Sequence, residues 1–136
     1  MQHQPANIYK RIIAVIIDHL IVNFLLYLLF TKFYGMNPAD PNLTTSHYLI
    51  FVLFNLGYFV ILEAVFAKTI GKKILNLEIR ETGGAKIKPL DSIVRNLLRP
   101  IDFICFYLFG MLFVANTARS QRLGDILAGT YVVESR

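Results

Sequence analysis

The sequence predicts an all-α membrane protein, a small bundle of two to three transmembrane helices with a cytoplasmic amphipathic segment. Hydrophobic residues make up 55% of the 136 positions and charged residues only 17%, less charge than the surface of a soluble domain of this size carries. The apolar residues fall in blocks long enough to cross a bilayer. Basic residues, which give a net charge of +5, flank these blocks. We expect one domain over residues 1–136.

The first helix is predicted at residues 11–32. Its apolar run, Ile12 to Phe30, holds 19 residues, and at about 1.5 Å each these span about 28 Å, close to the hydrocarbon thickness of a bilayer. Asp18 lies near the middle of this run, where an ionised carboxylate needs protein or water around it and a partner. Arg11 precedes Asp18 by seven residues, on nearly the same helical face. The length of the run and its acidic residue argue for a retained helix rather than a signal peptide.

A second helix is predicted at residues 48–67, after a loop at 35–47 that contains no Lys or Arg. Residues 68–99 hold eight basic and three acidic side chains. The positive-inside rule therefore puts this segment and the N-terminus in the cytoplasm, and the 35–47 loop outside. We expect a multi-pass protein of the cytoplasmic (inner) membrane, whose basic face contacts anionic lipid headgroups.

Within residues 68–99, the sequence predicts a short β-hairpin and then a helix. Apolar and polar residues alternate over 75–80, and a Gly83-Gly84 turn precedes residues 86–88, a pattern typical of a hairpin. Asp91 or Ser92 could cap a helix that runs through Arg99. Charged residues recur along this helix and predict one charged face, consisting of Asp91, Arg95, Arg99 and Asp102.

The length of the last apolar run, residues 101–115, does not show whether it spans the membrane. As a helix, residues 101–115 would cover only about 22 Å. Residues 100–117 could form a third span kinked at Pro100, or a re-entrant hairpin that turns near Gly110 and is shielded by protein. The tail, residues 119–136, mixes charged, small and apolar residues and suits an interfacial segment.

Several motifs resemble those of the RDD family of small integral membrane proteins. They are Arg11 and Asp18 in the first helix, KTIGKKILNLEIR followed by TGG, RNLLRPID, and QRLGDILAGTYVV near the C-terminus. The family is named for one arginine and two aspartates, and the resemblance implies that these are Arg11, Asp18 and Asp125. It also implies a membrane module of mostly unknown function that is linked to transport. Some members are associated with exchange of monovalent cations for protons.

Asp18 allows two interpretations. A buried carboxyl group could exchange a proton for a hard cation, with Asn23, Asn55 or backbone carbonyl oxygens completing the shell. Alternatively, an arginine neutralises the carboxylate in a structural ion pair that fixes how the helices pack. The arginines available for that pair are Arg11, Arg95, Arg99 and Arg122.

The remaining candidates for transport or ion pairing have similar alternatives. Glu63 could be a second transport carboxylate, or it could form a border salt bridge with Lys68 or a loop arginine. Asp102 and Asp125 each follow an arginine by three positions, so local pairs are expected. The polar residues expected inside the membrane, where hydrogen bonds between helices are common, are His19, Asn23 and Asn55.

The sequence contains no nucleophile–base pattern, metal-ligand spacing or cofactor fingerprint, so we expect no enzyme, metal or cofactor. No nucleic acid is expected as a partner, because the basic residues lack interleaved stacking aromatics. The first function hypothesis is proton-coupled monovalent cation exchange at Asp18, which requires a homo-oligomer because two or three helices cannot enclose a pathway. The second is a non-transporting scaffold or partner subunit whose Arg–Asp network is structural. A third is binding of a small hydrophobic or lipid ligand between the helices.

Overall fold

The computed structural model describes residues 4–35, 44–99 and 121–135. Two long helices dominate it, α1 (Ile8–Leu29) and α2 (Thr45–Phe66). A π-helical turn, η1 (Phe30–Tyr34), extends α1. Both helices are long and apolar enough to cross a membrane, and each begins three residues before the expected bound. The predicted segment 100–117, including Asp102, lies outside the described residues.

The ends of the long helices follow from local side chains. The side chain of Asn7 accepts a hydrogen bond of 2.9 Å from the backbone N–H of Tyr9 and so caps the start of α1. Gly35, with φ at 63°, ends the π-helical turn in the left-handed conformation. At the start of α2, the imidazole of His47 accepts from the backbone N–H of Thr44 at 3.1 Å. Ala67, with φ at 57°, ends α2.

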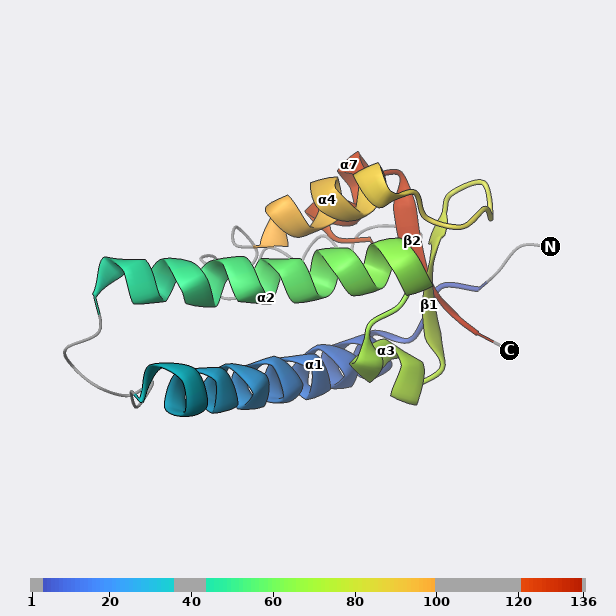
Figure 1. Cartoon of the computed structure of the whole chain (residues 1–136). Coiled ribbons are helices and arrows are strands. Elements are labelled where there is room, and N and C mark those ends of the chain that lie inside the picture. The colour runs from blue at the N-terminus through green and yellow to red at the C-terminus, as the bar shows by residue number, and fades with distance from the viewer. Residues whose placement is uncertain (1–3, 36–43, 100–120, 136) are drawn as a thin grey trace.

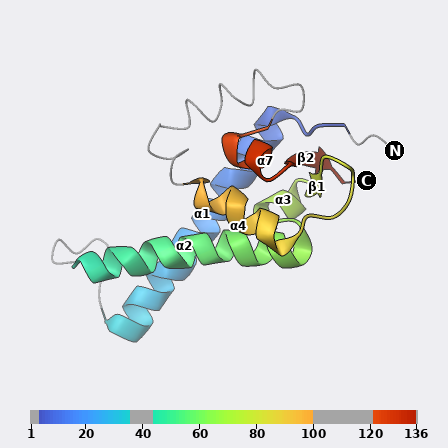
Figure 2. The same cartoon turned by 90° about the horizontal axis from the view of Figure 1, so that it is seen from above.

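Five short elements pack along the half of the helix pair where α1 begins and α2 ends (Figure 1). They are α3 (Ile70–Ile74), β1 (Leu77–Glu81), α4 (Pro89–Leu97), α7 (Leu123–Leu127) and β2 (Thr130–Glu134). Figure 2 shows that α1 and α2 cross and that α4 lies beside α2. The protein is therefore mostly helical, with one small two-stranded sheet in the described part.

The β-hairpin predicted within residues 75–88 forms only its turn and one bridge, and β1 pairs mainly with another strand. The antiparallel partner of β1 is β2, with Leu77 opposite Glu134 and Glu81 opposite Thr130. Residues 86–88 contribute only an isolated bridge between Lys86 and Arg80. The difference between the two partners is the extent of burial. Residues 130–133 of β2 are all buried, whereas in 86–88 only Ile87 joins the core and Lys86 and Lys88 are exposed.

The same pairing gives the C-terminal tail a place in the fold. Residues 130–133 are buried in the sheet, and the position of the tail relative to the membrane interface stays a prediction. The helix predicted before residue 99 also begins earlier than expected. Its N-cap is Lys88, and the side chain of Asp91 accepts from the Lys88 backbone N–H at 3.4 Å. Pro89 starts the helix because its fixed φ suits the first helical position.

The buried side of α1 carries a stripe that changes from charged to apolar. Its members recur every three or four residues and are Arg11, Ala14, Asp18, Val22 and Leu26. At the far end of the helix pair, Val22, Leu26 and Phe30 form an apolar cluster, and the Phe30 and Phe51 rings stack at 4.5 Å. At the other end the stripe reaches the short elements, where the buried polar groups lie.

Candidate functional site

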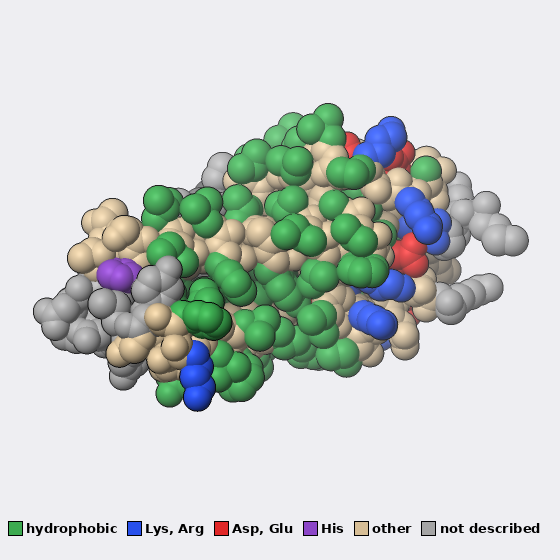
Figure 3. Space-filling view, in the orientation of Figure 1, with side chains coloured by type: hydrophobic (Ala, Val, Ile, Leu, Met, Phe, Trp, Pro, Cys, Tyr) green, Lys and Arg blue, Asp and Glu red, His purple; other side chains and the backbone are tan. Residues whose placement is uncertain are grey.

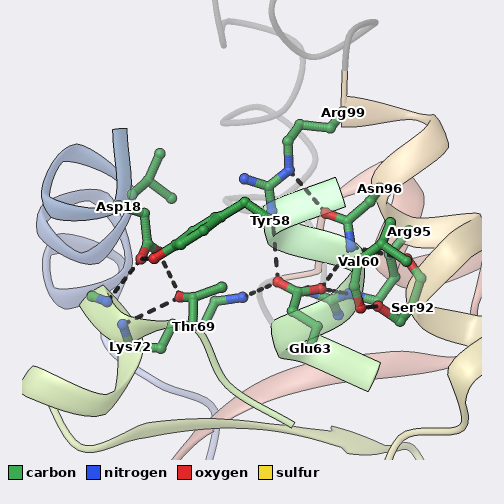
Figure 4. A network of polar contacts seen from close by, with 12 residues as sticks. Asp18, Tyr58, Val60, Glu63, Thr69, Lys72, Ser92, Arg95, Asn96 and Arg99 are labelled. Carbon is green, nitrogen blue, oxygen red and sulfur yellow. Dashed lines mark hydrogen bonds and ion pairs between the residues drawn. The ribbon is translucent and has the colours of Figure 1, made fainter. Parts of the chain in front are cut away.

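Asp18 is fully buried and binds three uncharged donors. Its Oδ2 accepts from the Thr69 hydroxyl at 2.5 Å, and its Oδ1 accepts from the Tyr58 hydroxyl at 2.9 Å. The backbone N–H of Gly71 donates to Oδ1 at 2.8 Å. Figure 4 shows the carboxylate of α1 facing α2 and the segment that leads into α3. Of the two interpretations of Asp18, the one that pairs it with an arginine is therefore contradicted among the described residues. The local chain supplies enough neutral donors to satisfy the carboxylate.

Close packing of α3 on α1 makes this arrangement possible. Thr69 is the N-cap of α3, and its hydroxyl accepts from the backbone N–H of Lys72 at 3.4 Å while donating to Asp18. A Cβ added to Gly71 would lie 2.2 Å from the carbonyl oxygen of Ala14. Glycine is therefore required at position 71, because it lets the backbone of α3 come within hydrogen-bonding distance of Asp18.

Glu63, in the last turn of α2, is the centre of a second buried cluster. Its carboxylate binds the ammonium group of Lys72. Arg95 Nε donates to Oε2 at 3.3 Å, Asn96 Nδ2 donates to the same oxygen at 2.9 Å, and Arg99 Nη2 lies 3.6 Å from Oε1. The Arg99 guanidinium also lies over the ring of Phe59, with Cζ 3.5 Å from the ring centroid. The border salt bridge of Glu63, for which Lys68 or a loop arginine was the alternative, thus forms with Arg95 and also with Lys72 rather than Lys68.

Asp125, in α7, extends the charged cluster to α1. Its Oδ1 lies 2.9 Å from Arg95 Nη1, and its Oδ2 lies 3.0 Å from Arg11 Nη2. Arg95 Nη1 also donates to the Thr130 hydroxyl of β2 at 2.7 Å. The local pair expected between Asp125 and Arg122 is present only as a hydrogen bond of 3.2 Å from the Arg122 backbone N–H. The ionic partners come from α1 and α4, because these helices bring buried guanidinium groups to α7.

The close contact of α7 with α4 again depends on a glycine. A Cβ at Gly124 would lie 2.7 Å from the carbonyl oxygen of Arg95. A cleft of about 10 Å³ remains beside this contact, room for about one water molecule. Its lining consists of Arg95, Asn96, Arg99, Arg122, Gly124 and Asp125.

Opposite charges set the protonation states of the groups outside the long helices. Burial lowers the pKa of Lys72 to about 8, although Glu63 partly offsets this effect. Burial alone would raise the pKa of Asp125, but Arg95 and Arg11 hold it below its usual range. For Arg95, burial is outweighed by Asp125 and Glu63, which raise its pKa. Arg95 and Asp125 are therefore ionised at neutral pH.

The other predicted polar residues lie apart from these contacts. Nδ1 of His19 is hydrogen-bonded to the Val15 carbonyl at 2.8 Å, and its ring lies 5.7 Å from that of Phe59. Asn23 is exposed and Asn55 is half-buried, and neither contacts the Asp18 carboxylate. They therefore do not complete a shell around Asp18, because the face of α1 that carries Asn23 points away from the buried stripe.

Sequence reasoning missed several residues of the site. They are Tyr58, Thr69, Gly71, Lys72 and Asn96. A usable signal existed for Asn96, which shares one helical face with Ser92, Arg95 and Arg99. Lys72 and Lys73 cannot be distinguished by residue type, although only Lys73 is exposed.

Comparison with known proteins agrees with the motifs. The profile of the RDD family matches residues 5–129. A protein from Bacillus subtilis (strain 168), described as "Uncharacterized protein YckC", is 27% identical over 138 residues. That alignment covers 96% of this chain and 85% of the relative. No solved structure matches the chain significantly. The match over nearly its whole length means that this chain belongs to the RDD family.

Proposed function

We propose that this membrane protein has a transport-related role in which Asp18 exchanges a proton for a monovalent cation. One observation carries the proposal. Asp18 is fully buried, yet its partners among the described residues are two hydroxyls and one backbone N–H. No basic side chain of the described part therefore holds its charge fixed. Glu63 and Asp125, in contrast, are each bound by at least two cationic groups.

The atoms around Asp18 suit a hard cation. The hydroxyl oxygen of Tyr58 lies 2.9 Å from Oδ1 of Asp18, and that of Thr69 lies 2.5 Å from Oδ2. A hydroxyl that now donates to Asp18 can rotate and present its oxygen to a cation instead. Oxygen atoms are the ligands that hard cations prefer. Protonation of Asp18 would remove its negative charge and release the cation, and the hydroxyls would then again be hydrogen-bonded to the carboxyl group.

The experiment compares proton movement in vesicles that contain the purified protein and a pH-sensitive dye. An imposed Na⁺ or K⁺ gradient should drive proton flux with the native protein. Asp18→Asn, which keeps the size of the side chain, should abolish the flux while leaving the helical content unchanged. Tyr58→Phe should raise the cation concentration needed for half-maximal flux. Glu134→Gln is the matched control, because Glu134 is an exposed carboxylate outside this site, and its flux should be unchanged.

The proposal includes assembly and orientation. Two helices cannot enclose a pathway, so we propose a homo-oligomer or a complex with another membrane protein, which cross-linking in native membranes would detect. We also propose the cytoplasmic membrane, with the N-terminus and the sheet of β1 and β2 on the cytoplasmic side. The basic residues at that end support this orientation, and anionic lipid headgroups would be their partners.

A scaffold function is the second candidate, favoured by a different observation. The ion pairs of Glu63 and Asp125 connect α1, α2, α3, α4 and α7. Such a network could serve only to hold the fold, with partner binding as the function. Under this alternative the native protein shows no cation-driven proton flux, and Asp18→Asn reduces stability or association.

A further inference from the structure

Helix α4 has its polar side inward and its apolar side outward. Ser92, Arg95, Asn96 and Arg99 follow one face of the segment and are at most 7% exposed. On the opposite face, Leu90 is 68% exposed, Ile93 40% and Leu97 57%. A helix on the surface of a soluble protein has the reverse arrangement. Large exposed apolar side chains grouped in this way indicate contact with something other than water.

Helices α3 and α7 show the same inversion on a smaller scale. In α3, Lys72 is buried while Ile70 and Ile74 are exposed. In α7, Asp125 is buried while Ile126 and Leu127 are exposed. The three helices thus enclose the ion pairs of Glu63 and Asp125 and turn apolar side chains to the outside.

The contacts of α4 and α3 place them beside the apolar lengths of the long helices. The Ser92 hydroxyl of α4 donates to the Val60 carbonyl at 3.0 Å. Val60 lies six residues before the end of α2, or about 9 Å along the helix. On the other side, Gly71 of α3 donates to Asp18, which lies six residues after the apolar run of α1 begins at Ile12, again about 9 Å. Both short helices therefore lie at a depth that the apolar surface of α1 and α2 also occupies.

The surface of the molecule continues from the long helices onto the short ones. Figure 3 shows apolar side chains over the middle of the molecule, with acidic and most basic side chains gathered at the end where the termini lie. The exposed face of α4 belongs to this apolar surface, since α4 packs along α2. Because this surface continues that of helices apolar enough to span a bilayer, lipid acyl chains are the expected contact for both.

We propose that α3, α4 and α7 are embedded in the bilayer, with their apolar faces against acyl chains. The ion pairs of Glu63 and Asp125 then lie inside the hydrophobic slab, shielded from lipid by helices of inverted polarity. Residues 68–99 are then not wholly a cytoplasmic surface segment. The sheet, the turn around Gly84 and the exposed Lys73 of α3 reach water. The inference is independent of any transport activity.

The absence of tryptophan from the sequence allows a direct test with single-tryptophan variants. Ile93→Trp reports on the outer face of α4. Leu53→Trp is the lipid control, because Leu53 is exposed on α2, and Lys86→Trp is the water control, because Lys86 is exposed near the sheet. Each full-length variant is reconstituted in phosphatidylcholine vesicles with brominated acyl chains, and fluorescence quenching is compared with quenching by aqueous iodide.

Ile93→Trp should match Leu53→Trp, with strong quenching by brominated lipid, little by iodide and a blue-shifted emission. Lys86→Trp should show the reverse. The proposal is overturned if Ile93→Trp is quenched by iodide like Lys86→Trp, which would put α4 in water. It is equally overturned if neither quencher reaches the indole, which would mean that protein, such as a second copy, covers the face. If Ile93→Trp lacks native helical content, quenching is measured on Leu97→Trp instead, because Leu97 lies on the same exposed face of α4.

Discussion

Replacing Gly71 with alanine tests the contact that holds α3 against α1. The added Cβ would lie 2.2 Å from the carbonyl oxygen of Ala14 and 3.0 Å from Cγ of Asp18. Both neighbours lie on α1, and the nearest of them is backbone. The clash is therefore relieved only if α3 moves away from α1 by about 1 Å, since nonbonded carbon contacts need more than about 3 Å.

The size of the effect follows from two contributions. Overfilling a packed contact typically costs about 1–3 kcal/mol. Moving α3 also lengthens the 2.8 Å hydrogen bond from the Gly71 N–H to the Asp18 carboxylate, and a hydrogen bond to a charged group contributes about 1.5–3 kcal/mol. We expect Gly71→Ala to lower the free energy of unfolding by about 3–5 kcal/mol.

The chain offers a matched control in Gly57. It lies within α2, and a Cβ there would meet nothing within 4 Å. Gly57→Ala should therefore leave stability unchanged or raise it by about 1 kcal/mol, because alanine favours the helix. Unfolding in SDS, followed by circular dichroism in mixed micelles, measures both variants against the native protein. The argument for close packing of α3 fails if Gly71→Ala is as stable as Gly57→Ala.

Three further predictions concern the ion pairs. Glu63→Gln removes the carboxylate that binds the buried ammonium group of Lys72 and should cost about 3–5 kcal/mol of unfolding free energy in SDS titrations; a loss below 1 kcal/mol would contradict the role of Glu63. The pKa of Asp125 is lower in the folded chain than in the unfolded one. Its stabilisation is therefore complete above about pH 4 and is lost as the pH falls further, so the stability gap between native protein and Asp125→Asn should narrow in acid; a constant gap from pH 7 to pH 3 would refute this. Lys10 pairs with Glu134 while both side chains are nearly half exposed, so Lys10→Ala should change stability by less than about 0.5 kcal/mol.

The long helices were predictable because their signal is local. An apolar run of 19 residues from Ile12 to Phe30 indicates a membrane helix without knowledge of any neighbour. Membership of the RDD family was likewise predictable, because its motifs are contiguous in the sequence. The profile match over residues 5–129 confirms it.

The strand pairing and the partners of Asp18 depend on distant parts of the chain. Alternation in β1 predicts a strand, but it cannot distinguish a nearby hairpin partner from β2, which begins 49 residues after β1 ends. Asp18 was expected to attract arginine because charge is visible in a sequence. Its partners, Tyr58, Thr69 and the backbone of Gly71, carry no formal charge, and only the fold brings them together.

The amphipathic character of α4 was predictable from the sequence, but the inversion of its polarity was not. Arg95 and Arg99 share a face with Ser92, and Leu90 and Ile93 lie on the opposite one. Taken alone, this pattern indicates an amphipathic helix whose charged face points to water. Which face is buried depends on Glu63 and Asp125, which lie in other elements. The direction of burial therefore required the structure.

The enclosure of these charges is tested most directly by the two adjacent lysines of α3. Lys72 is buried on Glu63, whereas Lys73 is exposed. A water-soluble reagent that acylates lysine amines is added to open membrane sheets that contain the native protein. Mass spectrometry then locates the modified lysines. We predict modification of Lys73 with Lys72 left intact. Similar rates at the two positions would show that water reaches Glu63 and would contradict a charged interior sealed by helices.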